Sequence, residues 1–200
     1  AKSLKNLLPA LSEDEIVEVT KLHSLGEHTI INNTVVDRPF RSPHHTASRA
    51  SIIGGGSKVQ PGEISLAHRG VLFLDELLEY PRTVLESLRQ PLEDHEITVS
   101  RANGKFNFPA NFLLVATMNP CPCGFLGDPE KTCICSQNQI LNYQKRLSGP
   151  LLDRIDLTVS VSRVPHEKLL NNKMSTKSQQ ETFLSEIHKA YSIQRDRYKC

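Results

Sequence analysis

The stretch Gly70-Val71-Leu72-Phe73-Leu74-Asp75-Glu76 decides the fold of this chain. Four large apolar residues follow one another without a break, a pattern that is typical of a strand buried on both faces of a parallel sheet. The two acids that follow cannot be core residues, because an unpaired buried carboxylate is strongly destabilising. Ligands of open α/β sheets bind at the carboxyl ends of the strands, so the two acids stand where a ligand would bind. A buried strand that ends in a plain acidic turn would fit the same residues.

A second strand of the same sheet is predicted from Phe112 to Thr117, where the sequence is again continuously apolar up to its last residue. It leads directly into Met118-Asn119-Pro120. In a parallel sheet Asn119 would lie at the same edge as the two acids and could add a polar group to the site. The alternative is that Asn119 only shapes the turn.

The composition is that of an ordinary globular chain. The protein has 200 residues, of which 38% are hydrophobic and 23% are charged, and its net charge is +2. Any binding of nucleic acid must therefore come from a local patch and not from the overall charge. The sequence shows neither an apolar run of the roughly 20 residues that span a bilayer nor a signal peptide, so the cytoplasm is the expected compartment.

The part of the chain before the central strand is less regular. Ser12 followed by Glu15 is a capping box, which predicts a helix over roughly 13–25. Residues 32–62 lose periodicity and are interrupted by Pro and Gly, so a long loop is expected there. His44-His45 in this loop could be read as metal ligands, but adjacent loop residues rarely reach one ion together.

A β-hairpin is predicted around Asn103-Gly104, the preferred pair of a two-residue type I′ turn. This turn would join strands Glu96–Arg101 and Lys105–Pro109, with Val99 opposite Phe108. Arg101 and Lys105 lie beside the turn. These two charged side chains either form a solvated hairpin end or contact the phosphate backbone of a nucleic acid.

Four of the five cysteines form two close pairs, Cys121-Pro122-Cys123 and Cys133-Ile134-Cys135. In a cytosolic protein such pairs indicate a metal site or plain thiols rather than disulfides. Four thiols could close a tetrahedral site for zinc or another thiolate-bound metal. One residue separates the members of each pair, where zinc sites usually have about two to four. Four reduced thiols in a loop are the alternative.

The C-terminal part offers one further charged candidate. Arg154 lies between Asp153 and Asp156, which by itself indicates a surface ion pair. The alternation of apolar and polar residues over 157–161 predicts a strand. The tail is expected to be helical from about residue 178.

Taken together, these segments resemble the magnesium-chelatase-like AAA+ ATPases, specifically their ComM/YifB branch. The resemblance covers most of residues 1–165 and rests on long blocks in the order that the family has: Arg38–Ser48, Gly54–Ser57, Pro61–His68, Gly70–Glu76, Met118–Gly124 and Leu147–Asp156.

The resemblance implies a nucleotide site that works with ATP and Mg²⁺. Asp75 and Glu76 would be the Walker B pair, in which Asp75 holds Mg²⁺ and Glu76 orients or deprotonates the attacking water. Asn119 would be sensor 1, which contacts the γ-phosphate or that water. Arg154 would be an arginine finger that acts on the ATP of a neighbouring subunit.

The resemblance also implies a ring-shaped DNA motor. The expected fold is an α/β P-loop NTPase core of the AAA+ type, with a parallel sheet flanked by helices. Thr46–Pro61 would be a helix-2 insert and Glu96–Pro109 a presensor-1 hairpin, and both project into the central pore of related machines. Arg101 and Lys105 then become candidate DNA contacts. The ComM branch is a hexameric motor implicated in natural transformation and in branch migration of DNA.

The sequence departs from the family pattern in one respect. The Walker A loop, G-x-x-x-x-G-K-[ST], is expected ahead of residue 1 and is not present, and Gly54–Lys58 lacks its spacing. Residues 1–165 are therefore expected to be a partial AAA+ core, and residues 166–200 the start of a helical lid. Without the loop that cradles the phosphates, we expect this polypeptide alone to hydrolyse ATP poorly, which leaves its own status as an enzyme open.

Two other functions fit the sequence. One is an ATPase subunit of magnesium chelatase, which acts in tetrapyrrole synthesis; the cysteine pairs and the Arg38–Ser48 block favour the ComM branch over it. The other is a non-enzymatic interaction module stapled by zinc at Cys121, Cys123, Cys133 and Cys135.

Overall fold

The computed structural model describes residues 2–26, 34–56, 59–101, 104–161 and 177–198. They form two compact units, one of residues 11–159 and the other of residues 1–10 with 160–200. The smaller unit contains a 3₁₀-helix, η1 (Lys2–Leu7), and the helix α9 (Lys177–Tyr198), which confirms the helix expected from about residue 178. None of the helices in the described ranges is long and apolar enough to cross a membrane.

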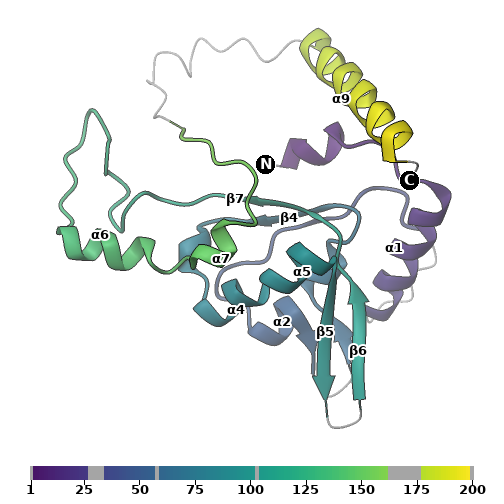
Figure 1. The fold of residues 1–200 in the computed structure, drawn as a ribbon, viewed down its shortest axis with the longest axis horizontal. Coiled ribbons are helices and arrows are strands. Elements are labelled where there is room, and N and C mark those ends of the chain that lie inside the picture. The colour runs from purple at the N-terminus through teal and green to yellow at the C-terminus, as the bar shows by residue number, and fades with distance from the viewer. Residues whose placement is uncertain (1, 27–33, 57–58, 102–103, 162–176, 199–200) are drawn as a thin grey trace. The chain divides into compact units, whose positions relative to one another are not determined.

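A parallel three-stranded sheet organises the larger unit (Figure 1). Its strands are β1 (Phe40–Arg41), β4 (Val71–Leu74) and β7 (Leu113–Ala116), in the order β1-β4-β7. The apolar run from Val71 to Leu74 is therefore a strand of a parallel sheet, as predicted, and it is the central one. The two-residue strand β1 falls in the segment that was expected to be a loop, because two residues are too few to show periodicity.

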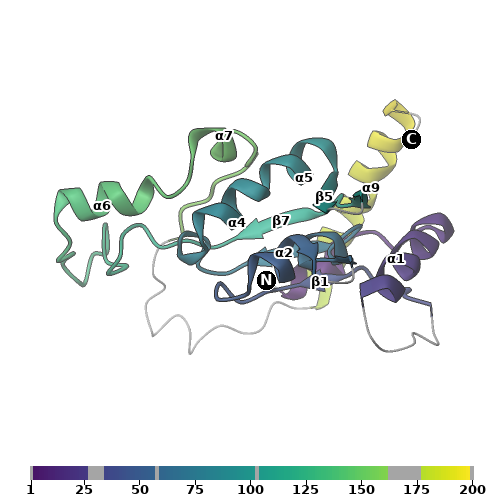
Figure 2. The same cartoon turned by 90° about the horizontal axis from the view of Figure 1, so that it is seen from below.

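The core lies mainly on one face of β4. Leu72 and Leu74 are two residues apart, so they point to the same side, and both are fully buried in the main apolar cluster. The helices α4 (Arg82–Ser87) and α5 (Arg89–Asp94) lie along the sheet (Figure 2). Val84, Leu85 and Leu88 belong to the same cluster. On the opposite face Phe73 stacks on Phe40 of β1, with ring centroids 6.1 Å apart.

The strand β7 is not the buried strand that its apolar sequence predicts. Leu113 is 46% exposed, and Leu114 and Val115 are only partly buried. The reason is its position: β7 pairs with β4 on one side, and no strand among the described residues pairs with its other side. Position in the sheet, which the strand's own sequence does not encode, sets its burial.

Two helices begin at capping boxes, of which the box at Ser12 was predicted from the sequence. Helix α1 (Glu13–Gly26) begins after Ser12, whose backbone N–H donates to Glu15 while the Ser12 hydroxyl accepts from the Glu15 N–H. Helix α6 (Gln137–Gln144) has the same box between Ser136 and Gln139. The other short elements are α2 (Arg49–Ile53), β2 (Gly54–Gly55), β3 (Gln60–Pro61), α3 (Glu63–Leu66), η2 (Leu77–Glu79) and α7 (Gly149–Leu152).

The predicted hairpin forms, but in a different register. Strands β5 (Glu96–Arg101) and β6 (Gly104–Pro109) pair Val99 with Phe106, not with Phe108, so Gly104 belongs to a strand. Residues 102 and 103 lie outside the described residues. At the base of the hairpin the Ala110 N–H donates to the His95 carbonyl, and Ile97 opposite Phe108 is buried. Packing at the base, and not the preference of Asn-Gly for a turn, accounts for this register.

The strand predicted over residues 157–161 is absent. These residues have neither helix nor strand, and Leu157, Val159 and Val161 are each about four-fifths exposed, at 84%, 78% and 84%. The alternation of apolar residues is present in the sequence, but no described strand pairs with it.

A buried histidine makes the stability of the fold depend on pH. The Asn111 N–H donates to His68 Nδ1, and His68 Nε2 donates to Glu18, so both ring nitrogens are satisfied when the ring is neutral. Burial lowers the pKa of His68 below its ordinary value, although Glu18 opposes this. The unfolded chain therefore takes up this proton at a higher pH than the folded chain does, and stability must fall as the pH drops below about 6.5.

We expect urea unfolding to show lower stability at pH 5.5 than at pH 7.5, and His68→Asn to reduce that difference. His188→Asn is the matched control, because His188 is exposed on α9. An unchanged pH dependence in His68→Asn would contradict the assignment of this effect to His68.

Candidate functional site

The two acids lie at the rim of the sheet, where β4 ends. Asp75 and Glu76 are both exposed, directly after the buried residue Leu74. Glu76 has a left-handed backbone, with φ 52° and ψ 52°. This conformation is costly for a residue other than Gly, Asn or Asp, and it is found preferentially at functional sites. The chain thus turns sharply at the position where the sequence predicts the ligand edge.

Thr117 connects the ends of the two neighbouring strands. Its hydroxyl donates to Asp75 Oδ1 and accepts from the Glu76 N–H at 3.1 Å, while its carbonyl accepts from the Leu77 N–H at 2.8 Å. Thr117 was not among the site residues predicted from the sequence. The signal was present in the register, because Leu74 pairs with Ala116 and the next residues along both strands are therefore Asp75 and Thr117.

The segment after β1 supplies a second group to this site. His45 Nδ1 lies 3.6 Å from Glu76 Oε2, an ion pair whenever the imidazole is protonated. The hydroxyl of the buried residue Tyr80 donates to the Pro43 carbonyl at 2.5 Å and so fixes this segment beside the acids. Burial, together with the negative charge of Asp75, raises the pKa of Tyr80 to about 12, which keeps the phenol a neutral donor.

The two adjacent histidines have different partners. His44 Nδ1 interacts with the Thr46 hydroxyl at 2.8 Å, whereas His45 is directed to Glu76. Among the described residues neither belongs to a cluster of potential metal ligands.

The chemistry of this rim suits a hard cation and an activated water. Carboxylate and hydroxyl oxygens are the ligands that Mg²⁺ prefers, and Asp75 and Thr117 present both. The Glu76 side chain is 51% exposed, so it can accept a proton or orient a water molecule. The donor set therefore fits a metal-bound phosphate group.

Asn119 lies three residues beyond the end of β7. It is exposed in the segment that follows β7, and no hydrogen bond is assigned to its side chain within the described part of the chain. Its predicted role as sensor 1 therefore rests on the resemblance.

Arg154 forms an ion pair inside the chain, with an unexpected partner. It follows α7 and reaches Glu93 of α5, with Nε 3.1 Å from Oε2, and its Nη1 donates to the Pro150 carbonyl at 2.5 Å. The hydrogen bonds and the charge of Arg154 hold the pKa of Glu93 below its usual value. The sequence pointed to Asp153 and Asp156 as partners, but the fold brings in Glu93 from 61 residues away. Any action on a neighbouring subunit would require Arg154 to leave Glu93.

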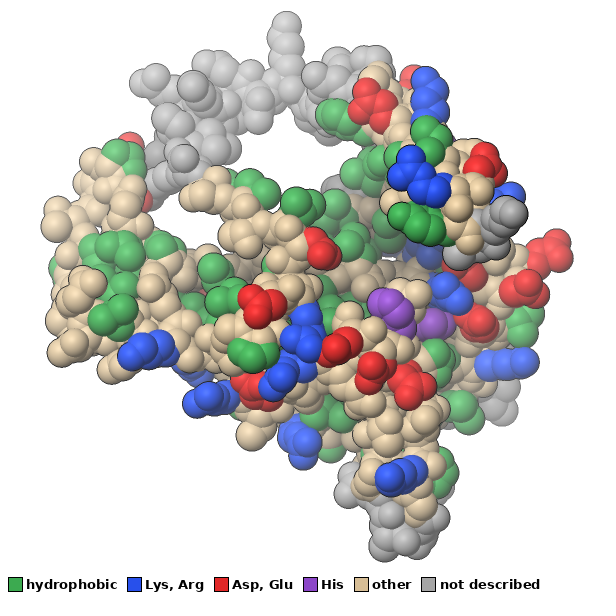
Figure 3. Space-filling view, in the orientation of Figure 1, with side chains coloured by type: hydrophobic (Ala, Val, Ile, Leu, Met, Phe, Trp, Pro, Cys, Tyr) green, Lys and Arg blue, Asp and Glu red, His purple; other side chains and the backbone are tan. Residues whose placement is uncertain are grey.

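The hairpin carries one described basic group. Lys105 is exposed at the start of β6, opposite Ser100. Arg101 ends β5, but its side chain lies outside the described residues. The face shown in Figure 3 mixes basic and acidic side chains, so no broad basic surface supports nucleic-acid binding there.

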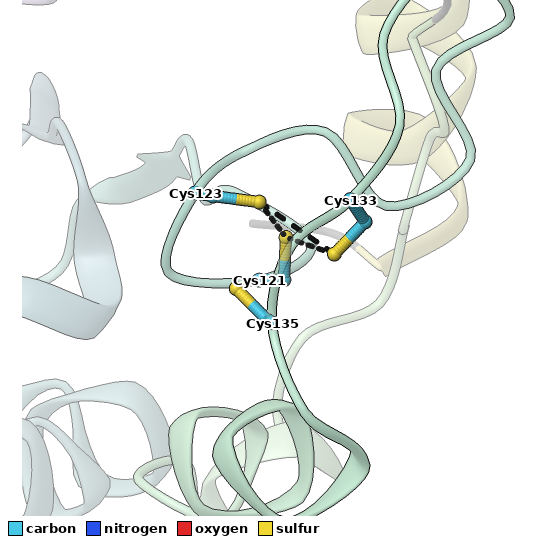
Figure 4. A group of neighbouring side chains, drawn as sticks. All are labelled: Cys121, Cys123, Cys133 and Cys135. Atoms are coloured by element: carbon cyan, nitrogen blue, oxygen red, sulfur yellow. Dashed lines mark hydrogen bonds between the residues drawn. The ribbon is translucent and has the colours of Figure 1, made fainter.

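The four predicted cysteines come together. Their sulfur atoms all lie within 4.8 Å of one another, and Figure 4 shows the side chains converging from two parts of one loop. Cys121 Sγ is 3.4 Å from Cys123 Sγ and 3.7 Å from Cys133 Sγ. These separations exclude disulfide bonds, whose sulfur atoms are about 2.05 Å apart.

The thiols influence one another's protonation. Backbone hydrogen bonds from Phe125 and Ile134 lower the pKa of Cys123 to about 6. At Cys133 the hydrogen bond with the Cys135 backbone acts to lower the pKa. Desolvation and the neighbouring sulfurs outweigh it and raise the pKa of Cys133 to about 12. One thiol of the cluster is thus ready to ionise, while a close neighbour resists a second negative charge.

Comparison with known proteins places these features in a family. The family described as "Magnesium chelatase, subunit ChlI" matches residues 1–169. Competence protein ComM of Haemophilus influenzae is 49% identical over 172 residues, which are 86% of this chain and 33% of that protein. The YifB protein of Escherichia coli (strain K12) is 46% identical over 166 residues, 82% of this chain and 32% of that protein. The chain thus spans about a third of the length of these relatives.

A solved structure, NtrX from Brucella abortus in complex with ADP, is 17% identical, with a TM-score of 0.42, and the match covers 62% of this chain and 25% of that one. This similarity is too low to support an argument of its own. The family match and the two relatives confirm the resemblance drawn from the sequence blocks. The chain therefore belongs to the magnesium chelatase ChlI-subunit family of AAA+ proteins, in its ComM/YifB branch.

Proposed function

We propose that this chain is a segment of an AAA+ motor that couples ATP hydrolysis to the remodelling or branch migration of DNA. The observation that carries the proposal is the junction of Asp75, Glu76 and Thr117 at the carboxyl end of the central strand, in a chain of this family. A site of oxygen ligands beside a half-exposed carboxylate is what hydrolysis of a metal-bound phosphate requires.

In this proposal each residue has one task. Asp75, held by the Thr117 hydroxyl, would bind Mg²⁺. Glu76 orients the attacking water and accepts its proton, and the hydrogen bond from its N–H to Thr117 keeps its backbone in place. Mg²⁺ would supply charge neutralisation at the phosphate oxygens. Asn119 would contact the γ-phosphate or the water, and Arg154 would serve the site of the next subunit after release from Glu93.

The thiol cluster lies outside this chemistry, because thiolates prefer zinc to magnesium. Zinc bound there would be structural.

The proposal extends to the whole protein by analogy with its relatives. A relative named a competence protein supports a role in DNA uptake or recombination. Arg154 acting in trans requires like subunits in a ring, for which we propose a hexamer, and a cytoplasmic location follows from the proposed substrate. We propose residues 1–165 as part of the AAA+ core and residues 166–200 as the approach to its lid.

The name of the matching family favours one alternative function, an ATPase subunit that drives insertion of Mg²⁺ into a porphyrin. It would use the same residues Asp75 and Glu76. Deletion of the gene distinguishes the two: loss of porphyrin metallation favours the chelatase, and loss of DNA recombination with normal porphyrins favours the DNA motor.

The hairpin provides the direct test of DNA binding. We expect Arg101→Ala combined with Lys105→Ala to weaken the binding of single-stranded or branched DNA by the full-length protein. The slope of log K against the logarithm of the salt concentration should become shallower by about two. Each lysine or arginine that no longer contacts a phosphate reduces that slope by about one. Fluorescence anisotropy at several salt concentrations measures both quantities.

Lys145→Ala is the matched control, because Lys145 is an exposed lysine at the end of α6, away from the hairpin strands. It should leave affinity and salt slope as in the wild type. If the double variant also behaves as the wild type, the hairpin is not a DNA contact.

A further inference from the structure

The segment between β7 and α6 is long, and its side chains stabilise it poorly. Residues 117–136 are all described, and they contain neither helix nor strand. Only Cys121 among them is buried, whereas Met118, Leu126 and Ile134 are 51%, 39% and 86% exposed. Ordering such a segment costs conformational entropy that so little apolar burial does not offset. A further interaction between the two ends of the segment would stabilise this conformation.

We infer that Cys121, Cys123, Cys133 and Cys135 bind one structural zinc ion that fixes this segment. A tetrahedral zinc site with Zn–S bonds of about 2.3 Å has sulfur–sulfur edges of about 3.8 Å. The three separations among Cys121, Cys123 and Cys133 are 3.4, 3.5 and 3.7 Å, and Cys135 lies within the same 4.8 Å cluster. The sulfurs are thus already close to the spacing that the ion requires (Figure 4).

Turns of the backbone allow cysteines that are separated by only one residue to reach the same cluster. The Gly124 N–H donates to the Cys121 carbonyl at 3.0 Å, which closes a turn around the first pair. Gly124 and Gly127 have φ angles of 79° and 82°, a left-handed region that glycine enters freely. The chain can therefore reverse twice within the loop and return Cys133 and Cys135 to the first pair.

Zinc is the ion that this donor set selects. Soft thiolate ligands in a tetrahedral arrangement favour zinc over the hard cations magnesium and calcium. Coordination requires the thiolate form, so binding releases the thiol protons to the solvent. Without an ion, several thiolates this close together would repel one another, whereas Zn²⁺ offsets two of their charges.

The ion would connect the ligand edge of the sheet to α6. Cys121 directly follows Asn119-Pro120, and Cys135 directly precedes Ser136, which caps α6. Gln144 near the end of α6 donates to the Pro120 carbonyl at 3.1 Å. Zinc would therefore hold both ends of the segment and place Asn119 at a fixed position. The zinc site itself does not depend on the proposed ATPase activity.

Metal analysis of the full-length protein, purified without chelators, tests the inference. We expect about one zinc per chain in the wild type. In the double variant Cys133→Ser with Cys135→Ser, the zinc content should fall by at least about tenfold. Cys200→Ser is the matched control and should keep its zinc; Cys200 lies outside the described residues. Replacement of zinc by cobalt should give the absorption bands of a tetrahedral thiolate site in the wild type and the control only.

A second measurement separates loss of zinc from loss of folding. Removal of zinc from the wild type should increase hydrogen exchange in residues 117–136 and leave the β4 strand protected. Wild-type protein with less than about 0.1 zinc per chain and freely alkylated thiols would overturn the inference. Iron in place of zinc would overturn the choice of ion.

Discussion

Gly70→Ala is expected to destabilise the fold by about 3 kcal/mol or more, among the largest effects of a single substitution in this chain. A Cβ atom at this position would lie 2.0 Å from the Pro39 carbonyl oxygen and 2.8 Å from two further backbone atoms of Pro39. Side chains can move aside, but this neighbour is backbone. The Pro39 carbonyl also accepts from the Val71 N–H at 2.8 Å, so it is part of the contact between β1 and β4.

The clash would act on both sides of the central strand. The Gly70 carbonyl accepts from the Leu113 N–H at 2.9 Å, which joins β4 to β7. Moving Gly70 away from Pro39 therefore strains the second pairing as well. Urea unfolding gives the free energy directly, provided that the slope with denaturant stays constant.

Gly149→Ala is the matched control for this substitution. A Cβ at Gly149 meets no atom within 4 Å, and the residue begins α7, where alanine is a favourable replacement. Its stability should stay within about 0.5 kcal/mol of the wild type. An equally small effect of Gly70→Ala would contradict the close approach of Gly70 to the Pro39 backbone, where β1 and β4 meet.

The sequence predicted those elements whose signal is local. The apolar run from Val71 to Leu74 predicted a buried strand, and the capping box at Ser12 placed a helix start. The spacing of the two cysteine pairs also predicted that their four thiols lie close together, because the loop between the pairs is short. In each case the residues that form the feature are close together in the chain.

The features that the sequence did not predict depend on distant contacts. Strand β1 exists because two residues pair with β4, and β7 is half-exposed because of its place in the sheet. Burial of Ile97 opposite Phe108 accounts for the hairpin register, against the local turn preference. At the site, Thr117 and Glu93 acquire partners 42 and 61 residues away. No periodicity in the sequence encodes such pairings.

Glu76→Gln in the full-length protein is expected to lower ATP turnover by about a hundredfold or more, the range for removal of a general base. Glutamine keeps the size and backbone preference of the side chain, so the left-handed turn at residue 76 and the hydrogen bond to Thr117 should persist. What it loses is the ability to accept a proton from water. Because Asp75 and Thr117 are untouched, binding of ATP with Mg²⁺ should change little. Phosphate release and nucleotide binding are measured separately.

Two further variants make this prediction specific to the site. Glu79→Gln changes another exposed acid three residues on, which is paired with Arg146 at 3.8 Å, and should keep turnover within about twofold. Thr117→Val removes the hydroxyl that holds Asp75 and should lower turnover, whereas Thr117→Ser restores the hydroxyl and should recover most of it. If Glu76→Gln retained near-normal turnover, Glu76 would not be the base. Water activation would then have to come from a group outside this rim, and the left-handed turn at Glu76 would be a purely structural feature.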